Sequence, residues 1–143
     1  MYHKIIIVGY LGRDPEMRYT ADGTPVTNFS VATSRRWNRP DGTQMDETVW
    51  FRVSAWRRLA ETCNQYLQKG RLVLVEGRLR PDDRGNPRIF TRSDGTTGAS
   101  FEVTALNVRF LGGRGEAPPA EVPGAPEEPP VEGEGEGEGE IPF

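Results

Sequence analysis

The segment Val49-Trp50-Phe51-Arg52-Val53-Ser54-Ala55-Trp56 is the most informative stretch of this 143-residue chain. Its β-branched and aromatic residues favour a strand, and successive side chains of a strand point to opposite faces. The odd-numbered residues are apolar and would face a core. The even-numbered residues are two tryptophans, one arginine and one serine, which make a poor core but a good exposed surface. The segment therefore predicts a half-buried strand with one aromatic and basic face.

Further β-type segments lie on both sides of this strand and are separated by turn residues. Asp22-Gly23 and Asp41-Gly42 are strong turn signals, and Arg84-Gly85-Asn86-Pro87 marks a loop tip. Shorter extended pieces are expected at Glu16–Tyr19 and Arg88–Arg92. The main strands are expected at His3–Gly9, Val26–Arg36, Glu47–Trp56, Arg71–Arg80 and Ser100–Leu111.

One segment, residues 58–69, has helical periodicity, and Gly70 is placed to end the helix. Five strands with a helix between the third and the fourth is the element order of an OB-fold barrel. We therefore expect an all-β protein with one helix, an OB-fold five-stranded barrel; an SH3-like or cold-shock barrel is the alternative. The apolar side of the helix would consist of Leu59, Cys63, Tyr66 and Leu67.

The charge of the chain is divided sharply between its two parts. All eighteen basic residues lie in positions 1–114, and together with twelve acidic residues they leave a formal charge of +6 there, whereas the rest of the chain carries nine Glu and no basic residue. The last 29 residues are dominated by Glu, Pro and Gly, a composition that predicts disorder. We expect an OB-fold domain at 1–112, a disordered Pro/Glu-rich linker at 113–131 and an acidic partner-binding tip at 132–143.

Several functional classes are disfavoured by the residues that the chain has in small supply. His3 is the only histidine and Cys63 the only cysteine, which is too few for a zinc site or a disulfide framework. No phosphate-binding loop pattern occurs. The apolar run Ile5–Val8 is too short for a signal peptide or a membrane span. We therefore expect a soluble intracellular protein that is not an enzyme and that has no catalytic residue, metal or cofactor.

The aromatic and basic residues instead predict binding of a nucleic acid. Trp50 and Trp56 could stack on bases, and Arg52 between them could neutralise a phosphate; the alternative is that the indoles belong to the core. Stacking does not distinguish DNA from RNA, so an RNA-binding OB protein and a structural adaptor remain open. Further candidates are Trp37, which follows Arg35 and Arg36, and Phe90, which lies in a loop region rich in Gly and Arg.

The sequence resembles the bacterial-type single-stranded DNA-binding proteins over nearly all of its first 112 residues and its last three. The resemblance is carried by segments that are specific only when taken together. They are Lys4-Ile5-Ile6-Ile7-Val8-Gly9, Leu11-Gly12-Arg13-Asp14-Pro15-Glu16, Phe29-Ser30-Val31-Ala32-Thr33, Thr48-Val49-Trp50-Phe51-Arg52-Val53, Leu59-Ala60-Glu61, Tyr66-Leu67-Gln68-Lys69-Gly70, Val75-Glu76-Gly77-Arg78-Leu79-Arg80 and Ile141-Pro142-Phe143.

This resemblance implies a bacterial, cytoplasmic and nucleoid-associated homotetramer. Such a protein would bind and protect single-stranded DNA irrespective of its sequence, in replication, recombination and repair. The resemblance also implies that an acidic tip docks into proteins of these pathways, and the tip would be Glu140, Ile141, Pro142 and Phe143. The stacking aromatic residues of the family fall on Trp37, Trp50, Trp56 and Phe90, and its basic contacts fall on Lys4, Arg52, Arg58, Lys69 and Arg80.

Overall fold

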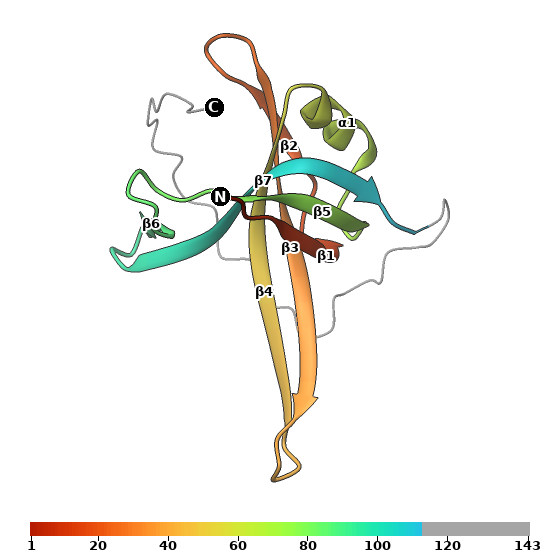
Figure 1. The fold of residues 1–143 in the computed structure, drawn as a ribbon, viewed down its shortest axis with the longest axis vertical. Coiled ribbons are helices and arrows are strands. Elements are labelled where there is room, and N and C mark those ends of the chain that lie inside the picture. Colours follow the sequence, from red (N-terminus) through yellow and green to blue (C-terminus); the bar gives the residue numbers. More distant parts are fainter. Residues whose placement is uncertain (113–143) are drawn as a thin grey trace.

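Five strands close into a barrel in the computed structural model, which describes residues 1–112 (Figure 1). Around the barrel, β1 pairs with β5, β5 with β7, β7 with β4 and β4 with β3, and β3 returns to β1. All of these pairings are antiparallel except that between β4 and β7. The barrel strands are β1 (Ile5–Leu11), β3 (Pro25–Asn38), β4 (Gln44–Trp56), β5 (Leu72–Leu79) and β7 (Thr97–Phe110).

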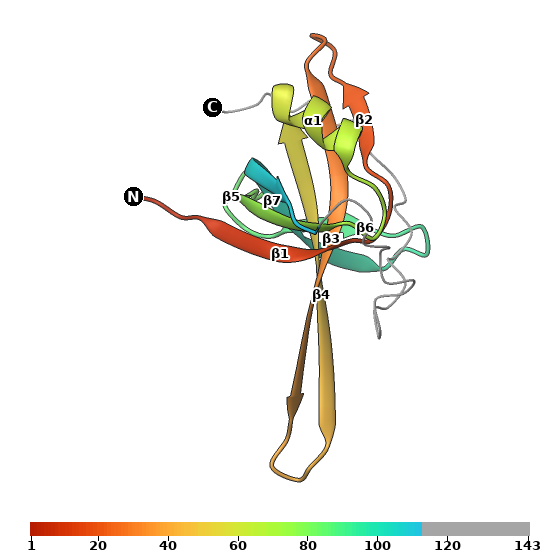
Figure 2. The same ribbon diagram turned by 90° about the vertical axis from the view of Figure 1, so that its right-hand side faces the viewer.

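Three smaller elements complete the described chain. The strand β2 (Glu16–Tyr19) pairs with β3, and β6 (Arg88–Thr91) pairs with β7. The helix α1 (Arg58–Tyr66) lies between β4 and β5 and covers the end of the barrel from which β2 extends (Figures 1 and 2). This element order confirms the prediction of an OB-fold barrel with one helix between the third and fourth main strands.

The core is formed by the apolar face of each barrel strand. Val53 and Ala55 of β4 are buried, as predicted from their alternation, and they are joined there by Phe29, Val31 and Val103. The hydroxyl of Thr27, which is also buried, donates to the backbone oxygen of Ala60 at 2.7 Å and ties α1 to β3. The hydrophobic contacts therefore run through the barrel and continue under the helix.

The helix ends earlier than the sequence predicted. It stops at Tyr66, and Leu67 has extended backbone angles although its N–H still donates to the oxygen of Cys63. The extended geometry places Leu67 in the core, whereas Tyr66 is 56% exposed. Gly70 has a φ of 80° and belongs to the turn before β5, where its N–H donates to the oxygen of Leu11. Tertiary contacts with β1 therefore outweigh the local helix signal.

Barrel closure brings backbones close together at two glycines. A Cβ atom at Gly9 would lie 2.1 Å from the backbone oxygen of Ala32, at the point where β1 meets β3, and one at Gly77 would lie 2.3 Å from that of Thr104. Both distances are far below a normal contact. Only glycine therefore fits at these crossings without moving a strand.

The hairpin of β3 and β4 continues well beyond the barrel as a two-stranded arm (Figures 1 and 2). At its tip, the carboxylate of Asp41 accepts the N–H of Thr43 at 2.8 Å, and Gly42 has a φ of 86°. The Asp-Gly signal in the sequence thus marks a real turn, but the strands around it are longer than predicted.

The predicted linker at 113–131 and the predicted acidic tip at 132–143 lie outside the described residues. Within residues 1–112, no helix is long and apolar enough to cross a membrane.

Candidate nucleic-acid interface

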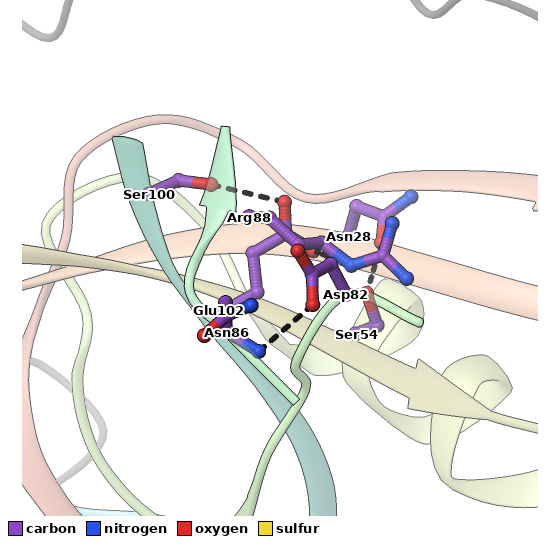
Figure 3. A network of polar contacts seen from close by, with 7 residues as sticks. All are labelled: Asn28, Ser54, Asp82, Asn86, Arg88, Ser100 and Glu102. Carbon is purple, nitrogen blue, oxygen red and sulfur yellow. Dashed lines mark hydrogen bonds and ion pairs between the residues drawn. The ribbon is translucent and has the colours of Figure 1, made fainter. Parts of the chain in front are cut away.

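The aromatic and basic face of β4 points away from the core. In the pairing with β3, Trp50 lies opposite Ala32 and Trp56 lies opposite Val26. Paired residues of neighbouring strands share a face, so this face continues from β4 onto β3. Between the two indoles, the hydroxyl of Ser54 donates to Oδ1 of Asn28 at 2.7 Å (Figure 3). We call this surface, together with its continuation described below, the outer face.

The side chains of this outer face are half-buried on β4. Trp50, Arg52 and Trp56 are all partly exposed, whereas the intervening Val53 and Ala55 are at most 1% exposed. The indole Nε1 of Trp50 is buried and has no hydrogen-bond partner among the described residues. Each of the two indoles is therefore partly accessible to a ligand and partly packed against the protein.

Phe90 joins the same face from β6. It pairs with Gly98 of β7, and a Cβ atom at Gly98 would lie only 2.6 Å from the ring, so the ring rests on that glycine. The guanidinium carbon of Arg52 lies 5.3 Å from the ring centroid, and that of Arg92 lies at 5.4 Å. Cation–π contacts of this kind orient both the ring and the cations. The sequence-predicted residues Arg52 and Phe90 are thus brought together.

The outer face also contains a carboxylate, on β7. Glu102 pairs with Arg52 of β4 in the parallel register, and its side chain is 19% exposed. Oε1 of Glu102 accepts the hydroxyl of Ser100 at 3.0 Å, while Oε2 lies 3.4 Å from Nε of Arg88 (Figure 3). Partial burial and the charge of Arg88 lower the pKa of Arg80, and Glu102 raises it in part. These charges are close enough to act on one another.

A turn supports the start of β6 next to this network. Oδ1 of Asp82 accepts the N–H of Arg84 at 2.9 Å and that of Asn86 at 2.8 Å. Figure 3 shows Asp82 and Asn86 beside Arg88. The loop tip at residues 84–87 was expected from the sequence, and the carboxylate of Asp82 gives it a fixed geometry.

Trp37 lies on the opposite side of the β3–β4 ribbon from Trp50. Trp37 pairs with Met45 in the arm, and Ala32 pairs with Trp50 and shares its face. Trp37 is five positions from Ala32 along β3. Because this number is odd, the indoles of Trp37 and Trp50 point to opposite faces. Trp37 is 36% exposed, and the guanidinium of Arg35 lies 4.4 Å from its ring centroid. The three tryptophans therefore do not form one platform.

Ion pairs across the arm engage both of its predicted arginines. Arg35 pairs with Glu47 at 3.4 Å, and Arg36 pairs with Asp46 at 2.6 Å. All four side chains are roughly half or more exposed, so water and salt screen these contacts. The arm therefore presents cations that already have partners.

Three other predicted basic residues lie away from the outer face or at its end. Lys4 forms an ion pair with Glu76, and the hydrogen bond with Glu76 raises the pKa of Lys4. Arg58 is the first residue of α1, directly after β4, and is exposed. Lys69 is exposed in the turn before β5, where its backbone N–H donates to Asp14.

Sequence reasoning missed the polar residues that complete the outer face. Asn28, Arg88, Ser100 and Glu102 belong to β3, β6 and β7, and their positions depend on strand register. The alternation of β4 could be read from one segment, whereas the neighbours of that strand could not. The only local sign in the sequence that one of these residues lies on the outer face was the spacing of two positions between Arg88 and Phe90, which places both on the same side of a strand.

Little in the described residues suggests metal or thiol chemistry. No group of three or more His, Cys, Asp or Glu is placed to hold a metal ion in residues 1–112. Burial raises the pKa of Cys63 to about 12, so its thiol stays protonated at neutral pH.

Comparisons with known proteins give one consistent result. The model of the single-strand binding protein family matches residues 2–111. A protein named single-stranded DNA-binding protein from Neisseria meningitidis is 42% identical over 114 residues; the match covers 80% of this chain and 62% of that relative. The protein of the same name from Thermotoga maritima is 45% identical over 129 residues, with 89% and 83% covered. The chain thus spans less than two thirds of the Neisseria relative.

Solved structures with a similar fold carry related names. A Plasmodium falciparum SSB in complex with ssDNA has a TM-score of 0.63 and 25% identity; the match covers 78% of this chain and 96% of that one. A deletion mutant of the single-stranded DNA binding protein from Thermus aquaticus has a TM-score of 0.60 and 27% identity, with 78% and 51% covered.

Proposed function

The chain belongs to the single-strand binding protein family, and we propose that it binds single-stranded DNA irrespective of base sequence, without catalysing a reaction. In this function it would protect exposed strands during replication, recombination and repair in the bacterial cytoplasm, in association with the nucleoid. The DNA would lie on the outer face, with its bases against Trp50, Trp56 and Phe90.

The outer face of β4 is the observation that carries this proposal. Two half-buried indoles flank Arg52, and Arg52 also lies against the ring of Phe90. In proteins of this class, stacking contributes about 1–3 kcal/mol per base and tolerates any sequence, because every base has a π-face. Arginines beside the rings would bind the backbone phosphates. The combination suits an unpaired strand better than a duplex, whose bases are hidden.

Titration of the protein with labelled (dT)30 tests the proposal. We expect tight binding that quenches the tryptophan fluorescence, weak binding of a duplex of equal length, and weakening of both as salt is raised. Equal affinity for (rU)30 would favour the RNA-binding alternative, since only contacts to the 2′-hydroxyl distinguish the two polymers. Absence of binding to any single strand would refute the proposal and favour an adaptor.

We further propose that the protein acts as a homotetramer. Ile6 and Val8 of β1 are 62% and 48% exposed, and β1 pairs with β3 only at Tyr10 and Leu11. The remaining edge of β1 is unpaired among the described residues, and unpaired edges with apolar side chains favour association. Light scattering coupled to size exclusion measures the mass directly. A monomer would refute this part of the proposal.

The C-terminal tip is proposed to recruit partner proteins. Its support is the sequence alone, in which Glu140-Ile141-Pro142-Phe143 follows an alternating Glu-Gly run. Carboxylates in this run would also compete with phosphates for the basic groups of the barrel. Deletion of residues 132–143 should therefore tighten binding of (dT)30 at low salt and have less effect at high salt. Unchanged affinity at low salt would contradict the competition.

A further inference from the structure

The ion pair between Arg88 and Glu102 is poorly formed for its degree of burial. Nε of Arg88 is buried and makes no hydrogen bond with any described residue, although Oε2 of Glu102 lies 3.4 Å away, which is longer than the usual N–H···O distance of about 2.9 Å. Oε1 of Glu102 is engaged by Ser100. A charged donor left in this state is costly, so Glu102 is a weak partner for the Arg88 guanidinium.

The surroundings of Glu102 favour an anion in its place. The backbone N–H of Arg80 donates to the backbone oxygen of Glu102 at 2.8 Å, and Arg52 pairs with Glu102 on the neighbouring strand. Burial and, in part, the charge of Arg88 lower the pKa of Arg80. Glu102 therefore lies among several cations of the outer face. Arg88 is 37% exposed along its side chain, so its outer nitrogens can be reached from solvent.

We propose that Glu102 is an internal competitor of the DNA backbone, which holds Arg88 in the free protein and yields it to a phosphate when single-stranded DNA binds. This inference rests on the proposed function and adds Arg88 as a phosphate contact and Glu102 as a residue that limits affinity. A phosphate oxygen can approach the guanidinium at hydrogen-bond distance, whereas Glu102 is restrained by Ser100 and by its own strand. Exchange of partners therefore improves the contacts of Arg88.

The proposal predicts opposite changes in DNA affinity for substitutions of Glu102 and of Arg88. Glu102→Gln keeps the shape of the side chain and removes the competing charge, so affinity for (dT)30 at low salt should rise about 3- to 10-fold. Arg88→Gln should lower the affinity by a similar factor but reduce the slope of log affinity against log salt by less than about 1, because the Glu102 carboxylate released in the wild-type protein takes up a counterion. Glu61→Gln is the control, because it changes the net charge equally on the exposed surface of α1.

The double variant decides whether the two residues act on each other. In the Arg88→Gln background, Glu102→Gln should have a clearly smaller effect than in the wild-type background, since the cation that forms the ion pair with Glu102 is absent. The proposal is overturned if Glu102→Gln weakens binding, matches Glu61→Gln in the wild-type background, or keeps its full effect without Arg88. Failure of the wild-type protein to bind (dT)30 would instead refute the proposed function itself.

A second measurement is made on the unmodified protein, and a variant serves only to assign the signal. In ¹H–¹⁵N spectra, the Nε–H resonance of Arg88, assigned from the missing peak in Arg88→Lys, should shift on addition of (dT)30. Addition of inorganic phosphate should move the same resonance in the same direction at much higher concentration. A resonance that does not move with (dT)30 would show that Arg88 keeps its carboxylate partner, and would overturn the exchange.

Discussion

Trp37 should contribute to the binding of long single strands and not to the binding of short ones. The strand rise is about 3.3 Å per residue, so Trp50 and Trp56 are separated by about 20 Å along β4. Met45, the partner of Trp37, lies about 17 Å further along the arm. Six nucleotides stacked at about 3.4 Å each span about 20 Å, which covers the first distance only. The ring of Trp37 also faces the other side of the ribbon.

Substitution of Trp37 by Ala should therefore weaken binding of (dT)30 about 5- to 150-fold, the equivalent of one stacked base. The same substitution should change the affinity for labelled (dT)6 less than twofold, as measured by fluorescence anisotropy. Trp50→Leu is the comparison, because it removes an indole from the outer face and should weaken both oligomers. Equal losses for (dT)6 and (dT)30 on replacing Trp37 would refute the assignment of the indoles to two faces.

Three further predictions concern the barrel and its turns. Gly9→Ala should destabilise the protein by about 1–3 kcal/mol or more in urea unfolding, because the new Cβ would overlap the backbone oxygen of Ala32; an unchanged midpoint would contradict this crossing. Cys63, whose pKa is raised to about 12 by burial, should react with a thiol reagent at pH 8 only when the protein unfolds, and immediate reaction would show an open core. Hydrogen bonds from Thr43 lower the pKa of Asp41, so its contribution to stability is fully present above about pH 4 and is lost as the pH falls through this lowered pKa. Asp41→Ala should consequently lower the melting temperature more at pH 7 than at pH 2.5, and an equal decrease at both would exclude the carboxylate as the cause.

The sequence predicted the strands well where local alternation and turn chemistry decide the structure. Both conditions hold for β4, whose buried residues follow the predicted alternation. The predicted end of the helix was wrong. Gly70 is a good local stop signal, but burial of Leu67 and a contact with β1 end the helix earlier, at Tyr66. Such contacts join residues far apart in the chain, so no local pattern contains them.

The candidate site was predictable only one strand at a time. Alternation placed Trp50, Arg52 and Trp56 on one face, but the face of Trp37 depends on the length of the hairpin. The sequence predicted that the strand ends at Arg36 and that a loop follows, whereas β3 continues to Asn38 and β4 already begins at Gln44. The face to which a side chain points follows from alternation only once its strand is known to be continuous. The DNA-binding role of each of these residues remains a prediction.

The formal charge of the barrel overstates the positive charge that a nucleic acid would encounter. At least five of its cations already form ion pairs with carboxylates, namely Lys4, Arg18, Arg35, Arg36 and Arg88. When a phosphate displaces such a carboxylate, the DNA loses a condensed counterion but the released carboxylate gains one. The net release of salt is then smaller than the number of phosphate contacts would give. A count of basic residues therefore predicts that a polyanion binds, whereas the pairing of those residues determines how strongly its binding depends on salt.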